Sequence, residues 1–146
     1  MNTFSDFAER FKDLISESGL SQKQIACAIG ITETSVSNYI NGKSEPSLKA
    51  LVAIADYFKC TTDYITGKKD ESEEKIFLPC PPFSTQLKIL MDKKPCSGYR
   101  LCTDANIPQA SFYDWKNGKT EPNLYNVKKL LDYFDCSLDF LLGRES

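Results

Sequence analysis

The sequence predicts an all-α protein built from two tandem domains of five helices each. Apolar residues recur three and four positions apart along most of the chain, which is the spacing of one helix face. In addition, the segment 41–46 returns almost unchanged at 117–122, and the apolar positions around it repeat at the same offset of 76 residues. Each copy has its own full set of apolar positions, so two copies of one fold are favoured over one larger domain.

Five stretches of the first copy combine helical periodicity with capping or stop residues: 3–18, 21–29, 32–40, 47–58 and 61–66. Ser21 and Thr32 are expected to cap the second and third helices, because their hydroxyl oxygens can accept hydrogen bonds from first-turn N–H groups. Gly30 supplies the backbone freedom for the turn between these two helices. The second copy is expected to repeat this order.

The repeat sets the expected domain limits at 1–68 for the first domain and 84–146 for the second, with a linker at 69–83. Charged residues fill the beginning of this linker, as is typical of a solvated connection. Three prolines and several apolar residues fill 76–83, which predicts an extended segment with its apolar side chains buried along a domain surface.

Composition narrows the class of protein. The 146 residues are 41% hydrophobic and 26% charged, which is typical of a soluble globular protein. The net charge of −2 argues against indiscriminate nucleic-acid binding, but a DNA reader needs only a local cationic rim. The chain has no histidine, no Gly-rich phosphate loop and no paired carboxylate cleft, so we expect no catalytic residues and no enzyme.

The six cysteines include no Cys-x-x-Cys pair, and without histidine their spacing suggests no metal site. They are expected to be reduced and mostly packed as small hydrophobes. The first residues lack the pattern of a signal peptide, and no stretch approaches the ~20 apolar residues of a membrane span. We therefore expect a cytoplasmic protein with no membrane partner.

The third predicted helix carries short polar residues on the side away from its apolar positions: Glu33, Thr34, Ser37 and Asn38. The DNA major groove admits one helix and shows a distinct donor and acceptor pattern for each base pair. Asn38 suits adenine, the methyl group of Thr34 suits thymine, and Glu33 can accept from a cytosine amine. The start of the second helix, with its exposed N–H groups, suits a phosphate.

At these positions the chain resembles the helix-turn-helix of the lambda-repressor/Cro-like (XRE) family of DNA-binding regulators. The resemblance rests on a set of residues at the family's spacing: Gln22, Ala26, Gly30, Val36, Ser37, Asn41, Gly42 and Pro46. It extends over the last two helices through Leu48, Leu51, Ile54, Ala55, Phe58 and Gly67. It implies the same four base-facing residues, and with the charge pattern it gives a set of phosphate contacts: Ser21, Gln22, Lys23, Asn41 and Lys43.

The second copy keeps the framework and alters the polar face. Gly98 replaces Gln22, and the four base-facing positions become Gln109, Ala110, Tyr113 and Asp114. The candidate DNA residues of this copy are Arg100, Gln109, Ala110, Tyr113 and Lys119. Two interpretations stay open for its aromatic helix, namely DNA contact, or a protein contact through dimerisation or packing between the domains.

The sequence thus predicts a transcriptional regulator of prokaryotic or phage type, expected to be a repressor, that binds double-stranded DNA. The family resemblance implies a homodimer and no cofactor, and no small-molecule substrate is evident. The alternative is a protein-interaction module, such as an antitoxin or a repressor partner, that keeps the fold and binds another protein through its polar faces.

Overall fold

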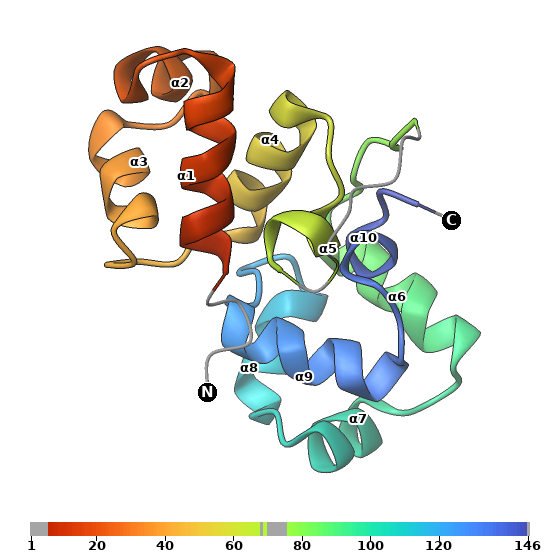
Figure 1. Cartoon of the computed structure of the whole chain (residues 1–146). Coiled ribbons are helices and arrows are strands. Elements are labelled where there is room, and N and C mark those ends of the chain that lie inside the picture. Colours follow the sequence, from red (N-terminus) through yellow and green to blue (C-terminus); the bar gives the residue numbers. More distant parts are fainter. Residues whose placement is uncertain (1–5, 68, 70–75, 146) are drawn as a thin grey trace. The chain divides into compact units, whose positions relative to one another are not determined.

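The computed structural model describes residues 6–67, 69 and 76–145. In this part of the chain the regular secondary structure consists of ten helices (Figure 1). The all-α prediction is therefore confirmed. The chain divides into two compact units between residues 75 and 76, and each unit is described by itself.

The first unit contains five helices: α1 (Phe7–Ser18), α2 (Gln22–Ile29), α3 (Glu33–Ile40), α4 (Leu48–Phe58) and α5 (Thr62–Ile65). Helix α3 packs against α1 and α2, α2 packs against α4, and α5 lies against α1 and α4. The predicted first helix began at residue 3. Its described part begins at Phe7 with Asp6 at the N-cap, and residues 1–5 lie outside the described residues.

The core of the first unit comes from the predicted apolar faces. Seven of its described apolar side chains are completely buried: Phe11, Ile25, Val36, Leu51, Ile54, Ala55 and Ile65. The ring of Phe11 stacks on Phe7 at 5.6 Å between centroids and meets the edge of Phe58 at 6.3 Å. Burial of each large apolar side chain contributes about 1.5–3 kcal/mol, so this cluster holds α3 firmly against the rest of the unit.

The second unit repeats the order with α6 (Phe83–Lys93), α7 (Gly98–Ala105), α8 (Gln109–Lys116), α9 (Leu124–Phe134) and α10 (Leu138–Leu142). The repeat extends to a hydrogen bond that joins the first and last helices of each unit. Arg10 donates to the Tyr64 carbonyl at 3.0 Å, and Gln86, 76 positions later, donates to the Phe140 carbonyl at 2.9 Å. The predicted duplication is therefore present in the packing as well as in the sequence.

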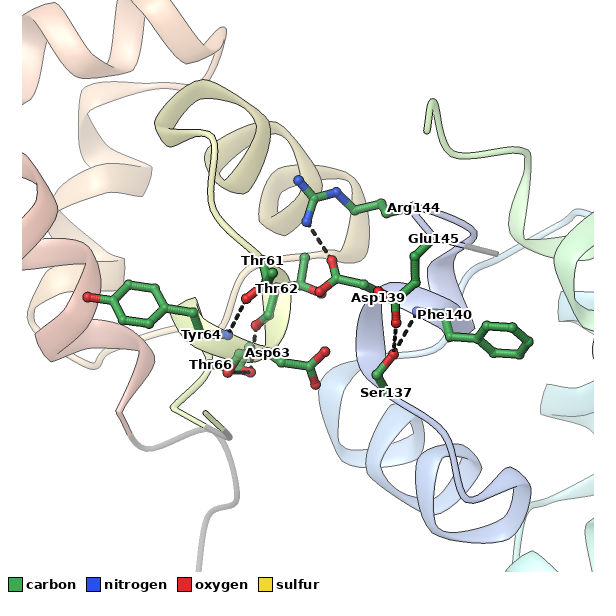
Figure 2. A network of polar contacts seen from close by, with 10 residues as sticks. All are labelled: Thr61, Thr62, Asp63, Tyr64, Thr66, Ser137, Asp139, Phe140, Arg144 and Glu145. Carbon is green, nitrogen blue, oxygen red and sulfur yellow. Dashed lines mark hydrogen bonds and ion pairs between the residues drawn. The ribbon is translucent and has the colours of Figure 1, made fainter. Parts of the chain in front are cut away.

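The short last helices begin in the same way in both units (Figure 2). Thr61 accepts from the Tyr64 N–H at 3.0 Å, and Ser137 accepts from the Phe140 N–H at 3.1 Å. These caps satisfy one exposed N–H group in each helix, which matters for elements of only four and five residues.

The segment 76–82 packs against the end of the second unit. The Leu78 N–H donates to the Arg144 carbonyl at 2.8 Å, and the Arg144 guanidinium lies 4.0 Å from the centre of the Phe77 ring. The same guanidinium donates to the Asp139 carboxylate at 2.6 Å (Figure 2).

The prediction that the apolar side chains of this segment are buried was wrong for two of them. Ile76 is 95% exposed and Leu78 is 48% exposed. Successive side chains of an extended backbone point to opposite sides. Phe77 therefore meets Arg144, while its two neighbours point away.

Candidate nucleic-acid interface

The pair α2 and α3 is built by local signals on both sides of one turn. Ser21 accepts from the Gln24 N–H at 3.2 Å while the Gln24 side chain accepts from the Ser21 N–H at 2.9 Å, which is a capping box. Gly30 ends α2 with a φ of +89°, in the left-handed region, and Thr32 caps α3 through the Ser35 N–H at 3.0 Å. The predicted caps and turn are confirmed.

The four predicted base-facing residues all lie on α3. Glu33 and Thr34 are exposed, Ser37 and Asn38 are half-buried, and Val36 between them is completely buried in the core. Because Val36 fixes the rotation of the helix, the polar positions are held on its outer side. The geometry brings together the residues that the sequence predicted, and contact with DNA stays a prediction.

The predicted phosphate residues lie at the start of α2 and just after α3. Lys23, Asn41 and Lys43 are exposed and Gln22 is half-buried. The Lys43 N–H donates to the Asn38 carbonyl at 2.9 Å, which closes the loop against the end of α3. The N–H groups of Gln22 and Lys23 belong to the open first turn of α2, which suits an anion.

The capping box gives a direct stability prediction. Ser21→Ala should lower the free energy of unfolding of the first unit by about 1 kcal/mol, because the Gln24 N–H loses its acceptor. Denaturant titration followed by circular dichroism measures this change. Ser16→Ala, an exposed position on α1, is the matched control and should change the stability by less than about 0.5 kcal/mol. Equal effects of the two substitutions would show that the cap contributes nothing.

In the second unit the candidate residues are also at the surface, on the corresponding helices. Arg100 is exposed on α7 and pairs with Asp104 at 3.2 Å. Gln109 and Ala110 are exposed at the start of α8, and Tyr113 on the same helix is 52% exposed. Lys119, the last candidate residue, is exposed in the loop after α8.

One difference between the units has a steric cause that sequence reasoning missed. Gly98 stands where the first unit has Gln22, and a Cβ atom added to it would lie 2.5 Å from Cε2 of Phe112. Phe112 stands where the first unit has the smaller Val36, and its ring is buried. The larger ring therefore requires the glycine. The sequence signal was that both positions differ between the two copies, with Gly98 for Gln22 and Phe112 for Val36. Helical periodicity does not connect these two positions.

A crevice of about 490 Å³ lies beside the start of α7, lined by Lys94, Pro95, Cys96, Ser97, Arg100, Asp104 and Tyr133. Lys94 donates to the Tyr133 carbonyl at 2.5 Å and lies 4.2 Å from the centre of its ring. Loss of hydration raises the pKa of Tyr133, helped by a hydrogen bond with Cys96, so the phenol is protonated at neutral pH. The crevice thus presents two cations, the Asp104 carboxylate that pairs with one of them, and a neutral ring.

The described residues contain no cluster of three or more His, Cys, Asp or Glu side chains able to hold a metal ion. Cys60 and Cys102 are buried as small hydrophobes, which raises the pKa of the Cys102 thiol, whereas Cys27 is exposed. None of the described helices is long and apolar enough to cross a membrane.

Comparison with known proteins matches both units to related family models. A model described as helix-turn-helix matches residues 12–65, and a model described as a Cro/C1-type HTH DNA-binding domain matches residues 86–145. Together the two matches cover most of the chain. No solved structure matches it.

Curated relatives come from Bacillus subtilis (strain 168). The SPbeta prophage-derived uncharacterized HTH-type transcriptional regulator YonR is 36% identical over 59 residues, which are 40% of this chain and 55% of the relative. The uncharacterized HTH-type transcriptional regulator YqaE is 34% identical over 71 residues, 49% of this chain and 60% of the relative. The HTH-type transcriptional regulator ImmR is 27% identical over 66 residues, 45% of this chain and 52% of the relative. The matches thus span little more than half the length of these relatives.

Proposed function

The chain belongs to the Cro/C1-type (XRE) helix-turn-helix family, with two copies of its domain in tandem, and from this premise we propose that it is a sequence-specific DNA-binding transcriptional regulator. The family is one of regulators and not of enzymes. The observation that carries the proposal is the outer side of α3, where four polar residues stand on a helix fixed by a buried Val36. The regulator acts as a repressor by occupying an operator, in the cytoplasm of a prokaryotic or phage-infected cell.

In this proposal α3 enters the major groove. Asn38 bonds adenine through its amide, Thr34 and Ser37 offer a methyl group and a hydroxyl to neighbouring bases, and Glu33 accepts from a cytosine amine. Phosphates flank this helix on both sides and are held by Ser21, Gln22, Lys23, Asn41 and Lys43. The two exposed cations among them come from different elements, Lys23 from the first turn of α2 and Lys43 from the loop after α3.

We keep the domain limits 1–68 and 84–146, with 69–83 between them, as part of the proposal. Residues 76–82 then serve as an arm of the second domain, because Phe77 and Leu78 contact Arg144. A single α2–α3 pair makes a small footprint on DNA, so a homodimer on an inverted operator would strengthen binding. This dimer is the second partner that we propose beside duplex DNA.

The salt dependence of DNA binding tests this function. If the first unit neutralises three to five phosphates, the logarithm of the association constant should fall against the logarithm of the salt concentration with a slope of about −3 to −4.5, and more steeply where the second unit also contacts phosphates. Fluorescence anisotropy with a labelled random-sequence duplex and the intact chain measures this slope. Absence of binding by folded protein at low salt would contradict the proposal and favour the protein-interaction module.

One observation favours that second candidate, a protein-interaction module. Three tyrosines of the second unit are exposed at positions where the first unit has lysine or serine: Tyr99 at 70%, Tyr113 at 52% and Tyr125 at 68%. Exposed tyrosine is enriched at protein interfaces. This alternative would be established if one copy of the purified chain bound another through these tyrosines and the chain did not bind DNA.

A further inference from the structure

We propose that the second unit is a sequence-tolerant DNA clamp, which grips the phosphate backbone through Lys94, Arg100, Lys116 and Lys119 and adds little base readout. This inference rests on the proposed function of the first unit as a DNA reader. Duplex DNA is the one partner of the proposed surface, which consists of the start of α7, the outer side of α8 and the loop after α8. The features of this surface have counterparts 76 residues earlier, in the first unit.

The backbone around the proposed phosphate contacts is the same in both units. After the third helix of each unit, Gly42 and Gly118 adopt φ values of +70° and +75°. The next N–H group then donates back to the helix, from Lys43 to the Asn38 carbonyl at 2.9 Å and from Lys119 to the Asp114 carbonyl at 2.8 Å. Lys119 therefore starts from the same position relative to its helix as Lys43.

One of the two hydrogen bonds of the capping box at the start of the preceding helix is also retained. Ser97 accepts from the Arg100 N–H at 3.0 Å, as Ser21 accepts from the Gln24 N–H at 3.2 Å. The capping bond that orders this turn is therefore kept in the second unit, whereas Arg100, which cannot accept a hydrogen bond, replaces the Gln24 side chain that completes the capping box of the first unit.

Three of the four base-facing side chains, in contrast, have lost the groups that discriminate bases. Ala110 lacks the hydroxyl of Thr34, and Asp114 replaces the donor and acceptor amide of Asn38 with a carboxylate that only accepts. Tyr113, at the place of Ser37, is a large ring that is half exposed. Its hydroxyl suits a phosphate oxygen, which carries no sequence information. Gln109, at the place of Glu33, is the one base-facing amide of α8.

Cations are gained around the same frame. Arg100, Lys94 and Lys116 stand where the first unit has Gln24, Ser18 and Ile40, and all three are exposed. One cation is lost, because Tyr99 replaces Lys23.

The four cations of this surface outnumber the three acidic side chains near it. Asp104 pairs with Arg100 through its Nε atom at 3.2 Å, and Asp114 and Glu121 flank Lys119 in the sequence. Residues 76–145 carry nine basic and eight acidic side chains, whereas residues 6–67 carry six and eight. The second unit therefore carries the more positive charge. This charge favours contact with a polyanion such as DNA over contact with the first unit of another copy of the chain.

Salt titration of paired variants tests the clamp. The double variant Arg100→Gln/Lys119→Gln of the intact chain removes two cations from the proposed surface, and Lys12→Gln/Lys88→Gln removes two exposed cations from the first helices of the units. Binding is measured with two labelled duplexes of equal length and composition, one recovered by selection from a random pool and one with its sequence scrambled. Circular dichroism verifies that both variants are folded.

We expect the slope of log affinity against log salt to become shallower by about 1.8 in Arg100→Gln/Lys119→Gln and to stay unchanged in the control. Between 50 and 200 mM salt the wild-type affinity should therefore fall about 12-fold more than that of the variant. The loss should be equal on both duplexes, because phosphate contacts are not sequence-specific.

Two results would overturn the clamp while leaving the first unit's role intact, namely a slope equal to that of the control or a loss confined to the selected duplex. The latter would show that the second unit reads bases. If the wild-type chain binds neither duplex at low salt, the proposed function itself fails, and the clamp fails with it.

Discussion

Replacing Gly98 by glutamine, the residue at the equivalent position 22, is expected to lower the free energy of unfolding of the second unit by about 2 kcal/mol. The new Cβ would lie 2.5 Å from Cε2 of Phe112, closer than non-bonded carbons approach. Phe112 is only 1% exposed, so its ring has little room to retreat. Overpacking of this kind costs about 3 kcal/mol, and the better helix propensity of glutamine offsets about 1 kcal/mol of that.

The companion variant Phe112→Val keeps this prediction falsifiable. Phe112→Val alone should cost about 2 kcal/mol through the cavity that it leaves. Adding Gly98→Gln to that background recreates the Gln22 and Val36 pair of the first unit and should cost nothing further. Trp115 is the chain's one tryptophan and is buried in the second unit, so its fluorescence follows this unfolding selectively. Additive costs in the double variant would contradict the coupling.

Removing two base contacts from α3 is expected to weaken the binding of a selected DNA duplex. Thr34→Ala/Asn38→Ala should weaken binding to a selected duplex about 100-fold, because each good base contact is worth about 1–3 kcal/mol of discrimination. Binding to a scrambled duplex should stay within about twofold of wild type, since no phosphate contact changes. Anisotropy titration at fixed salt measures both affinities, and their ratio is the specificity.

The control for this variant is Thr85→Ala, an exposed threonine on α6. It should leave both affinities unchanged. If Thr34→Ala/Asn38→Ala weakened both duplexes equally, α3 would be a phosphate contact and the assignment of its base-facing residues would be wrong.

Most of the fold was predictable because its determinants are local. Capping residues such as Ser21 and Thr32, the left-handed Gly30, and the spacing of Val36 within its helix are visible in the sequence and appear as predicted. The repeat then carried the same assignment into the second unit. The ion pair between Arg100 and Asp104 was also accessible, because residues four apart face one another on a helix.

The features that the sequence did not show depend on tertiary neighbours. Nothing in the local pattern connects Gly98 with Phe112, because they lie on different helices. The exposure of Ile76 likewise depends on which side of the extended segment faces Arg144. For the DNA site, the sequence predicted which residues share the outer side of α3. It did not predict which bases they bind, because that depends on the donors and acceptors that the DNA presents.

Selection of duplexes from a random pool, with the wild-type chain and Asn38→Ala in parallel, shows whether α3 reads bases. We expect one short motif for the wild type, in a single copy or as an inverted pair, beside flanking DNA without base preference. In the variant, the preference for adenine at one base pair of each motif should disappear while the rest of the motif persists. Failure of the folded wild type to enrich any motif, or an identical motif from both proteins, would contradict base reading by α3.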